Sequence, residues 1–510
     1  MGTTTLQSQA FNVGGDISIT PKQNIGILFH GFINPIGIDK QNTTYLKNNG
    51  TLDSSILTNS FIKRDIDNLN YNINYRGVFG KYEHHIITAD ADYSEYDRSS
   101  LENLQNDFYD AAGIEYHDPS YFRINSPAHI NVRSAKIDYQ RLIKKNVFEA
   151  GVKISKVKSI NKIDFERMQN GNYTPIDTLT DHFTYNEQIT AAYANYIANW
   201  GKTSLIVGLR VEETKANRLS LNPNRVADTS YFNFFPNIQV THDVGEEHQF
   251  ILNYNRSISR PTYQDLNPFV GYIDQYAYSR GNPFLRPQYT STFQFSDVYR
   301  IKFKATLGLN VTKYFSAMVF KQDDETGVYT TIRENIGTRY QYALDILAPF
   351  DITRWWQITN DIAATYERYV YTIPGAKNRS VYDLLVKSNQ NFSLTRKLKA
   401  DVNLSYETPT YYGIKSYREQ FFMDAGVSYT ILHDQGSIKL AVTDIFNTQT
   451  DRYNTRFLNL DLRGREKQGT RFVVATFAYR FGNNVLRNAR KRTGGITDEQ
   501  TRLGGSTSEN

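Results

Sequence analysis

The residues that could carry catalysis or bind a metal are scattered along this chain of 510 residues. His84 and His85 are neighbours on an expected strand, so they point to opposite faces and cannot ligate one ion from regular geometry. The acidic run Asp323-Asp324-Glu325 lacks the glycine-spaced ligand order of a calcium loop. The chain has no cysteine, which removes disulfides, thiol nucleophiles and cysteine metal sites. We therefore expect no enzyme activity, no catalytic or cofactor-binding residue, and no metal site.

One segment, residues 260–285, is better suited to recognising a ligand. It carries aromatic side chains and an acid that could stack on, or hydrogen-bond to, a sugar, a siderophore or a peptide: Tyr263, Asp265, Phe269, Tyr272, Tyr276 and Tyr278. The alternative is that these side chains pack against one another within the loop. Because function often resides in loops, we predict a candidate ligand-binding loop for an unidentified extracellular ligand.

The elements that would hold this loop are β-strands with one apolar and one polar face. From Leu398 to Glu407 every even position is apolar or aromatic and every odd position is polar or charged. Successive strand side chains point to opposite faces, so Lys399, Asp401 and Glu407 must face water. The same alternation recurs along the chain, for example from Leu205 to Val211, and no comparable helical periodicity is present.

The connections between these strands alternate between short and long. Short turns are predicted at 21–22, 80–81, 144–145, 200–201, 245–246, 299–301, 351–354, 396–397 and 434–436. On the other side the connections are mostly long, with two short exceptions, and are predicted at 38–64, 98–127, 164–182, 218–230, 260–285, 321–335, 373–379, 413–416 and 448–468. Outer-membrane barrels have short periplasmic turns and long extracellular loops, so this pattern assigns the two sides. About nineteen strands result, each long enough to cross a bilayer.

Composition agrees with an all-β, antiparallel transmembrane barrel over residues 1–482. No apolar run approaches the eighteen residues of a transmembrane helix. Tyrosine and phenylalanine number 37 and 30 in a chain with 22% charged residues, which suits a lipid-facing outside and a wet interior. The formal net charge of +6 is dispersed rather than gathered into a stripe, so nucleic-acid binding is not expected. No signal peptide is visible at the start.

Two features stand apart from the regular strands. Asp444 falls on the apolar parity of its strand, so we expect it near the outer rim or beside a bulge. Residues 483–510 are polar and basic and end in a run rich in Gly, Ser and Thr. Such a composition cannot bury a core, so we expect a disordered tail on the periplasmic side.

Three passages resemble the barrel of TonB-dependent receptors, in particular the outer membrane protein β-barrel family. The first is the two-part motif at 259–269 and 281–287, SRPTYQDLNPF and GNPFLRP, which looks like an extracellular loop of that family. The second, LAVTDIFN at 440–447, is similar to a penultimate strand. The third is the closing strand, with Phe477, Tyr479 and Phe481, whose aromatic end looks like the signal read by the barrel-assembly machinery.

The resemblance implies a 22-stranded barrel around an N-terminal plug, in the outer membrane of a Gram-negative bacterium. Plug and TonB would be partners beside outer-membrane lipid, yet no plug or first three strands precede Phe11, so the chain looks like strands four to twenty-two. The implied function is uptake of a bulky nutrient such as a siderophore, glycan or peptide. A passive porin-like or adhesin-like barrel remains an alternative. A hydrolase using His117, His129 or His182 is a third.

Overall fold

The computed structural model describes residues 2–48, 51–80, 84–221, 224–274, 276–481 and 495–503. Almost all of them lie in strands. The first half of the chain contains β1 (Gly2–Leu6), β2 (Gln9–Thr20), β3 (Gln23–Asn48), β4 (Thr51–Phe79), β5 (His85–Asp110), β6 (Glu115–Asn125), β7 (Ala128–Ile143), β8 (Asn146–Gln169), β9 (Asn172–Pro175), β10 (Asp181–Trp200), β11 (Thr203–Leu221), β12 (Asn224–Val244) and β13 (His248–Ser259).

The second half begins with a short helix that interrupts the strands. Its elements are α1 (Tyr263–Leu266), β14 (Val270–Asp274), β15 (Ala277–Arg280), β16 (Gln288–Tyr299), β17 (Phe303–Gln322), β18 (Tyr329–Asp351), β19 (Trp356–Tyr371), β20 (Arg379–Ser393), β21 (Leu398–Glu407), β22 (Tyr411–Tyr412), β23 (Lys415–Tyr417), β24 (Gln420–Ile431), β25 (Gly436–Val442), β26 (Asp451–Phe457), β27 (Leu460–Glu466), β28 (Val473–Tyr479) and α2 (Thr497–Gln500). Neither helix, nor any other helix in the described ranges, is long and apolar enough to cross a membrane.

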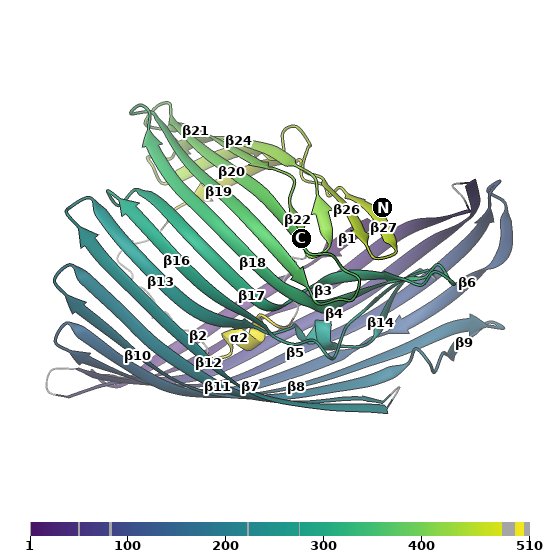
Figure 1. Ribbon diagram of the computed structural model, residues 1–510, viewed down its shortest axis with the longest axis horizontal. Coiled ribbons are helices and arrows are strands. Elements are labelled where there is room, and N and C mark those ends of the chain that lie inside the picture. Colours follow the sequence, from purple (N-terminus) through teal and green to yellow (C-terminus); the bar gives the residue numbers. More distant parts are fainter. Residues whose placement is uncertain are drawn as a thin grey trace.

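The principal strands form one continuous antiparallel ladder that curls into a barrel (Figure 1). The order along the ladder is β2, β3, β4, β5, β7, β8, β10, β11, β12, β13, β16, β17, β18, β19, β20, β21, β24, β25 and β28. These are nineteen strands of the described chain, so the sequence-based count is confirmed. Each tight turn that was predicted within the described ranges joins two of these strands. The predicted turn at 80–81 lies partly outside those ranges, because residues 81–83 are not described.

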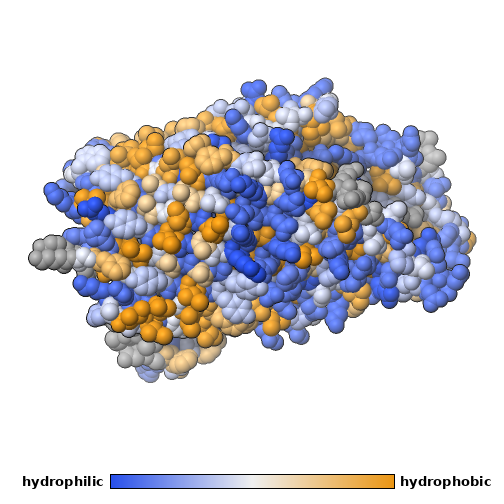
Figure 2. Space-filling model, turned by 90° about the horizontal axis from the view of Figure 1, so that it is seen from below, coloured by the Kyte–Doolittle hydropathy of each residue, from blue (hydrophilic) through white to orange (hydrophobic). Residues whose placement is uncertain are grey.

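Strand parity separates the two faces of the wall. In β8 the side chains of Lys153, Ser155 and Val157 are buried on the inner face, whereas Val152 and Ile154 are exposed on the outer face. Figure 2 shows the outer surface, where orange apolar residues gather toward the end that holds the short turns and the opposite end is mostly blue. Since the apolar end would face lipid, the hydrophilic end is the part that projects outward.

The two ends of the ladder stay unpaired with each other in the described residues. β28 pairs with β25, and β2 pairs with β3, but no pairing joins β28 to β1 or β2. Every residue of β28 is exposed, including Phe477 and Tyr479, and Phe481 follows just beyond the strand. The expected closing strand therefore lies at a free edge of the sheet, beside the penultimate strand.

Several predicted long loops turn out to be extensions of the strands. The predicted connection 38–64 is a hairpin, because β3 runs to Asn48 and β4 starts at Thr51, and the same holds at 218–230 and 321–335. These boundaries were wrong for a physical reason. Beyond the bilayer both strand faces meet water, so the ladder continues without the apolar alternation that revealed it in the sequence.

The tail also differs from its prediction where the structure describes it. Residues 495–503, which include α2, lie inside the barrel, where Ile496 and Leu503 are buried in the same apolar cluster as Val132 and Tyr185 of the wall. The basic stretch from Arg487 to Arg492 and the last seven residues lie outside the described ranges. The composition of 495–503 is typical of a solvated tail. Its apolar side chains Ile496 and Leu503 nevertheless pack against the lumenal wall.

Candidate functional site

The chain between β13 and β16, residues 260–287, turns into the barrel at its outer end; we call it the mouth loop. Its first residue sets that direction. Arg260 Nη2 donates to Glu212 Oε2 of β11 at 2.6 Å and to Thr214 Oγ1 at 3.1 Å. Glu212 also accepts from Arg210 Nε at 2.6 Å. Both partners of the Arg260–Glu212 pair are buried, so the pair joins the loop to the lumenal wall.

A capping box then starts α1. The Asp265 backbone N–H donates to Thr262 Oγ1 at 3.0 Å, and the Thr262 N–H donates back to Asp265 Oδ2 at 3.4 Å. Asp265 Oδ1 also accepts from Arg333 Nε of β18 at 3.1 Å. The second half of the motif docks on this turn, since the Asn282 N–H donates to the Asp265 carbonyl at 2.6 Å. A Cβ on Gly281 would lie 2.1 Å from the Asn267 carbonyl oxygen, so only glycine fits there.

The hairpin of β14 and β15 carries the mouth loop across to the opposite wall. Asp274, which is buried, accepts from Thr44 Oγ1 at 2.6 Å and from Asn42 Nδ2 at 3.1 Å, both on β3. β15 adds a parallel ladder to β18. The mouth loop is thus tied to β3, β11 and β18, which lie at three separate positions around the barrel.

The six candidate ligand-binding residues do not converge on one cavity. Tyr263 is buried in the lumenal cluster, and Asp265 is engaged by Arg333. Tyr272 packs against the rings of Phe122 and Phe165, with centroids 5.5 and 5.8 Å away. Phe269 packs at the edge of the same cluster, while Tyr276 and Tyr278 are half-buried on the hairpin. The first four thus pack against the barrel wall, whereas within the loop the rings of Tyr272 and Tyr278 lie 5.5 Å apart. A ligand role for the set stays a prediction.

A cavity of about 490 Å³ lies instead beside the mouth loop, and we call it the mouth cavity. Its charged and aromatic lining consists of Arg218, Arg260, Arg286, Arg502, Glu187, Asp228, Tyr185, Tyr231, Phe284, Tyr289 and Tyr314. Arg260 and Arg502 each pair with a buried glutamate. In the described chain no carboxylate pairs with Arg218 or Arg286, whose guanidinium carbons lie 5.8 and 5.4 Å from the ring centroids of Tyr185 and Tyr314. The cavity therefore offers two unpaired cations among tyrosines.

The lumenal wall below the cavity is lined with polar side chains that the sequence reasoning did not single out. Asn68, Asn70, Asn72 and Asn74 of β4 are all buried, and Asn72 Nδ2 donates to Asp92 Oδ1 of β5 at 2.8 Å. The signal was available, because asparagine at every second position marks one strand face. A hydrogen-bonded amide row keeps a wet interior ordered without apolar packing.

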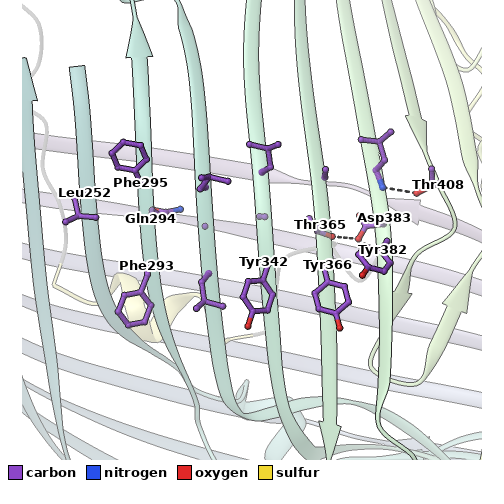
Figure 3. Close-up of a pocket in the computed structure, with 17 residues that line it drawn as sticks. Leu252, Phe293, Gln294, Phe295, Tyr342, Thr365, Tyr366, Tyr382, Asp383 and Thr408 are labelled. Carbon is purple, nitrogen blue, oxygen red and sulfur yellow. Dashed lines mark hydrogen bonds between the residues drawn. The ribbon is translucent and has the colours of Figure 1, made fainter. Parts of the chain in front are cut away.

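One surface groove lies on the outer face of the barrel rather than in the lumen. A groove of about 880 Å³ runs over the outer face of β13 and β16 to β20 (Figure 3). Phe293, Tyr342, Tyr366 and Tyr382 line it from the lipid-facing parity, whereas Gln294 sits on the opposite parity. Exposed aromatics on that face match the aromatic girdle of a membrane barrel, so lipid is its expected occupant.

The three histidines considered for a hydrolase come from separate strands. His117, His129 and His182 lie on β6, β7 and β10, and His129 Nδ1 contacts Asp97 Oδ1 at 2.6 Å on the outer face. Ligand atoms of Glu95, Asp97 and His129 all lie within 4.8 Å of one another. Sequence reasoning did not find this group, since its members come from two strands. It is partly exposed, and exposed acidic groups are common without an ion.

Asp444 lies at the outer rim, as expected. It lies two residues beyond the end of β25, adopts a positive φ of 42° and is buried. Burial alone would raise the pKa of Asp444, but hydrogen bonds from Thr470, Thr448, Gln449 and Lys467 outweigh it and lower the pKa to about 2. The carboxylate thus organises the loop before the last strand, which explains a charge on the apolar parity.

Comparison with known proteins agrees with the fold. Residues 78–479 match the sequence profile described as "Outer membrane protein beta-barrel family". The siderophore receptor PiuA from Acinetobacter baumannii superposes with a TM-score of 0.55 at 11% identity, covering 94% of this chain and 81% of that one. No curated protein sequence matches the chain.

Two further structures give similar values. The copper transporter OprC has a TM-score of 0.54 at 10% identity, with 94% of this chain and 80% of that one covered. BauA, the ferric preacinetobactin receptor from Acinetobacter baumannii, has a TM-score of 0.54 at 10% identity, with 94% and 79% covered. At such identities the likeness concerns the fold.

Proposed function

Because the chain belongs to the outer membrane protein beta-barrel family, we propose that it is the membrane barrel of a TonB-dependent importer of a bulky, negatively charged nutrient. The family places the chain in the outer membrane of a Gram-negative bacterium. Similar structures are named as a siderophore receptor, a ferric preacinetobactin receptor and a copper transporter. These names suggest the kind of cargo to test first.

The observation that carries the proposal is the mouth loop with its cavity. A loop tied to three parts of the wall narrows the barrel entrance, which suits selective capture better than free diffusion. Among the described residues Arg218 and Arg286 have no carboxylate partner, and Tyr231, Tyr289 and Tyr314 supply aromatic surface. Guanidinium groups recognise carboxylate or phenolate oxygens, and aromatic rings stack on flat ligands. A large anionic chelate is the ligand class that fits both.

Uptake measured in cells tests the proposal. The probes would be radiolabelled ferric hydroxamate and ferric catecholate siderophores, Cu²⁺ and a maltodextrin, each with and without a protonophore. We expect accumulation of one anionic chelate that the protonophore abolishes. Accumulation that persists without the proton motive force would identify a passive pore, and surface binding without accumulation would identify an adhesin.

The cavity is tested separately from the energy coupling. Arg218→Gln and Arg286→Gln should each weaken probe binding by roughly tenfold, because each removes one charge-assisted contact. Lys215→Gln is the matched control, since Lys215 lies on β11 but on the outer face, paired with Glu213. If all three variants bind alike, the mouth cavity is not the capture site.

A further inference from the structure

The segment inside the barrel, residues 495–503, makes contacts that are specific rather than incidental; we call it the C-terminal segment. Its buried Arg502 contacts both the barrel wall and the mouth loop. Nη1 donates to Glu187 Oε2 at 2.5 Å, and Nε donates to the Pro261 carbonyl at 3.0 Å. The guanidinium also lies over the Tyr263 ring, 4.4 Å from its centroid. In return the Tyr263 N–H donates to the Arg502 carbonyl at 3.1 Å.

The other end of the segment is fastened independently. The Gly495 N–H donates to Asp92 Oδ2 at 2.9 Å, and Ser134 Oγ donates to the Gly495 carbonyl at 3.4 Å. A Cβ on Gly495 would lie 2.7 Å from Asp92 Oδ2, so a larger residue would not fit this position without a shift. Between the ends, Gln500 Nε2 donates to Asn70 Oδ1 at 2.6 Å.

A second buried ion pair lies between these ends. Lys153 Nζ on β8 lies 3.0 Å from Glu499 Oε2, and both side chains are at least nine-tenths buried. An unpaired buried charge is costly, so Lys153 and Glu187 both need a partner in the lumen. The wall thus presents one cation and one anion, and the C-terminal segment supplies the opposite charge to each.

We infer that residues 495–503 are an intramolecular ligand of the lumen, a latch that holds the mouth loop against the barrel wall. Arg502 lies between Glu187 of β10 and the loop residues Pro261 and Tyr263, so one side chain ties wall and loop together. Arg502 also lines the mouth cavity, so the segment contributes a side chain to that cavity. This inference goes beyond nutrient import and does not depend on it.

The chain has no native cysteine, so a single introduced thiol reports on the segment without background. Leu503→Cys and Ile496→Cys place the thiol at buried positions, 5% and 3% exposed, near the two ends of the segment. Ile301→Cys is the reference, because Ile301 is 94% exposed in the turn between β16 and β17. The probe is a polyethylene-glycol maleimide too bulky to enter the lumen, applied to the full chain refolded in detergent micelles.

We expect both segment thiols to react at least roughly tenfold more slowly than the Ile301→Cys thiol, because reaction requires the segment to leave the lumen. Equal rates at all three positions would overturn the inference. Heat-modifiable migration on gels identifies folded barrels, so a variant that fails to fold is recognised and the other segment thiol is used.

The ion pair is tested in the Leu503→Cys background. Glu187→Gln leaves Arg502 buried without its charge partner and should speed labelling by roughly tenfold to a hundredfold. Glu213→Gln removes a carboxylate from the outer face of the neighbouring strand β11 and should leave the rate unchanged. If the two glutamine variants label alike, Arg502 and Glu187 do not hold a latch.

Discussion

Arg260 Nη2 and Glu212 Oε2 lie 2.6 Å apart, and this buried pair fixes the point where the mouth loop leaves the wall of the barrel. The same chain contains an exposed pair with the same distance, Arg300 Nη2 and Glu247 Oε1 at 2.6 Å, which joins two neighbouring short turns. The two distances are equal, so distance does not tell which pair contributes more to stability. The difference in burial does.

Arg260→Ala should lower the free energy of unfolding by roughly 3 kcal/mol, because it leaves Glu212 buried with one guanidinium instead of two. Arg300→Ala should lower it far less, since exposed ion pairs contribute little. Urea unfolding of the barrel in lipid vesicles measures both. Equal losses would show that the Arg260 pair is not structurally special.

Gly281→Ala should open the mouth loop. The added Cβ would lie 2.1 Å from the Asn267 carbonyl oxygen and 2.7 Å from that of Asp265, and backbone atoms cannot move aside cheaply. Limited proteolysis of intact outer-membrane vesicles should cut the loop faster in this variant. Gly15→Ala is the control, because nothing lies within 4 Å of its added Cβ. Unchanged cleavage of the Gly281 variant would mean that the loop is not held by this contact.

Neighbouring residues on β16 distinguish lipid face from lumen. Phe293→Arg places a charge on the exposed outer parity and should cost roughly 2 to 4 kcal/mol in a bilayer. Gln294→Arg, one residue away, faces the lumen beside Asn253 and should cost less than about 1 kcal/mol. The measurement is again unfolding from lipid vesicles. A larger loss of unfolding free energy for Gln294→Arg than for Phe293→Arg would show that the lipid-facing and lumenal faces of β16 are assigned the wrong way round.

Asp444 predicts a pH-dependent stability. Its pKa of about 2 in the folded chain is below the ordinary value of 3.8, so its stabilisation is complete above about pH 4 and is lost as the pH falls through about 2. Asp444→Asn should therefore lower stability by roughly 2 kcal/mol at pH 7 and by almost nothing near pH 2.

The control for Asp444 is Asp461→Asn. Asp461 pairs with Arg456 at 3.2 Å, but its side chain is half exposed, so the substitution should change little at either pH. Denaturant midpoints of the three proteins at the two pH values decide the matter. A loss for Asp444→Asn that is the same at both pH values would show that its charge does not organise the rim loop.

The barrel wall was predictable because its physical cause acts residue by residue. A strand that faces lipid on one side and water on the other must alternate, and the run from Leu398 to Glu407 does so without exception. The alternation sufficed for the strand count, the short turns and the lipid face. The alternation failed to predict where β3 ends and β4 begins. Both strand faces meet water there, so the sequence pattern does not mark the strand boundary.

What the sequence by itself determined is therefore the kind of wall, the side of each turn and the motif that forms the mouth loop. Only the tertiary structure decided which charges meet. Arg502 and Glu187 are separated by 315 positions in the sequence. Strand periodicity relates only residues a few positions apart, so it could not predict this pair. Their pairing depends on how the whole sheet curls. A buried charge is costly unless an opposite charge lies beside it. Here the opposite charge comes from a distant part of the chain, so no local sequence pattern predicts the pair.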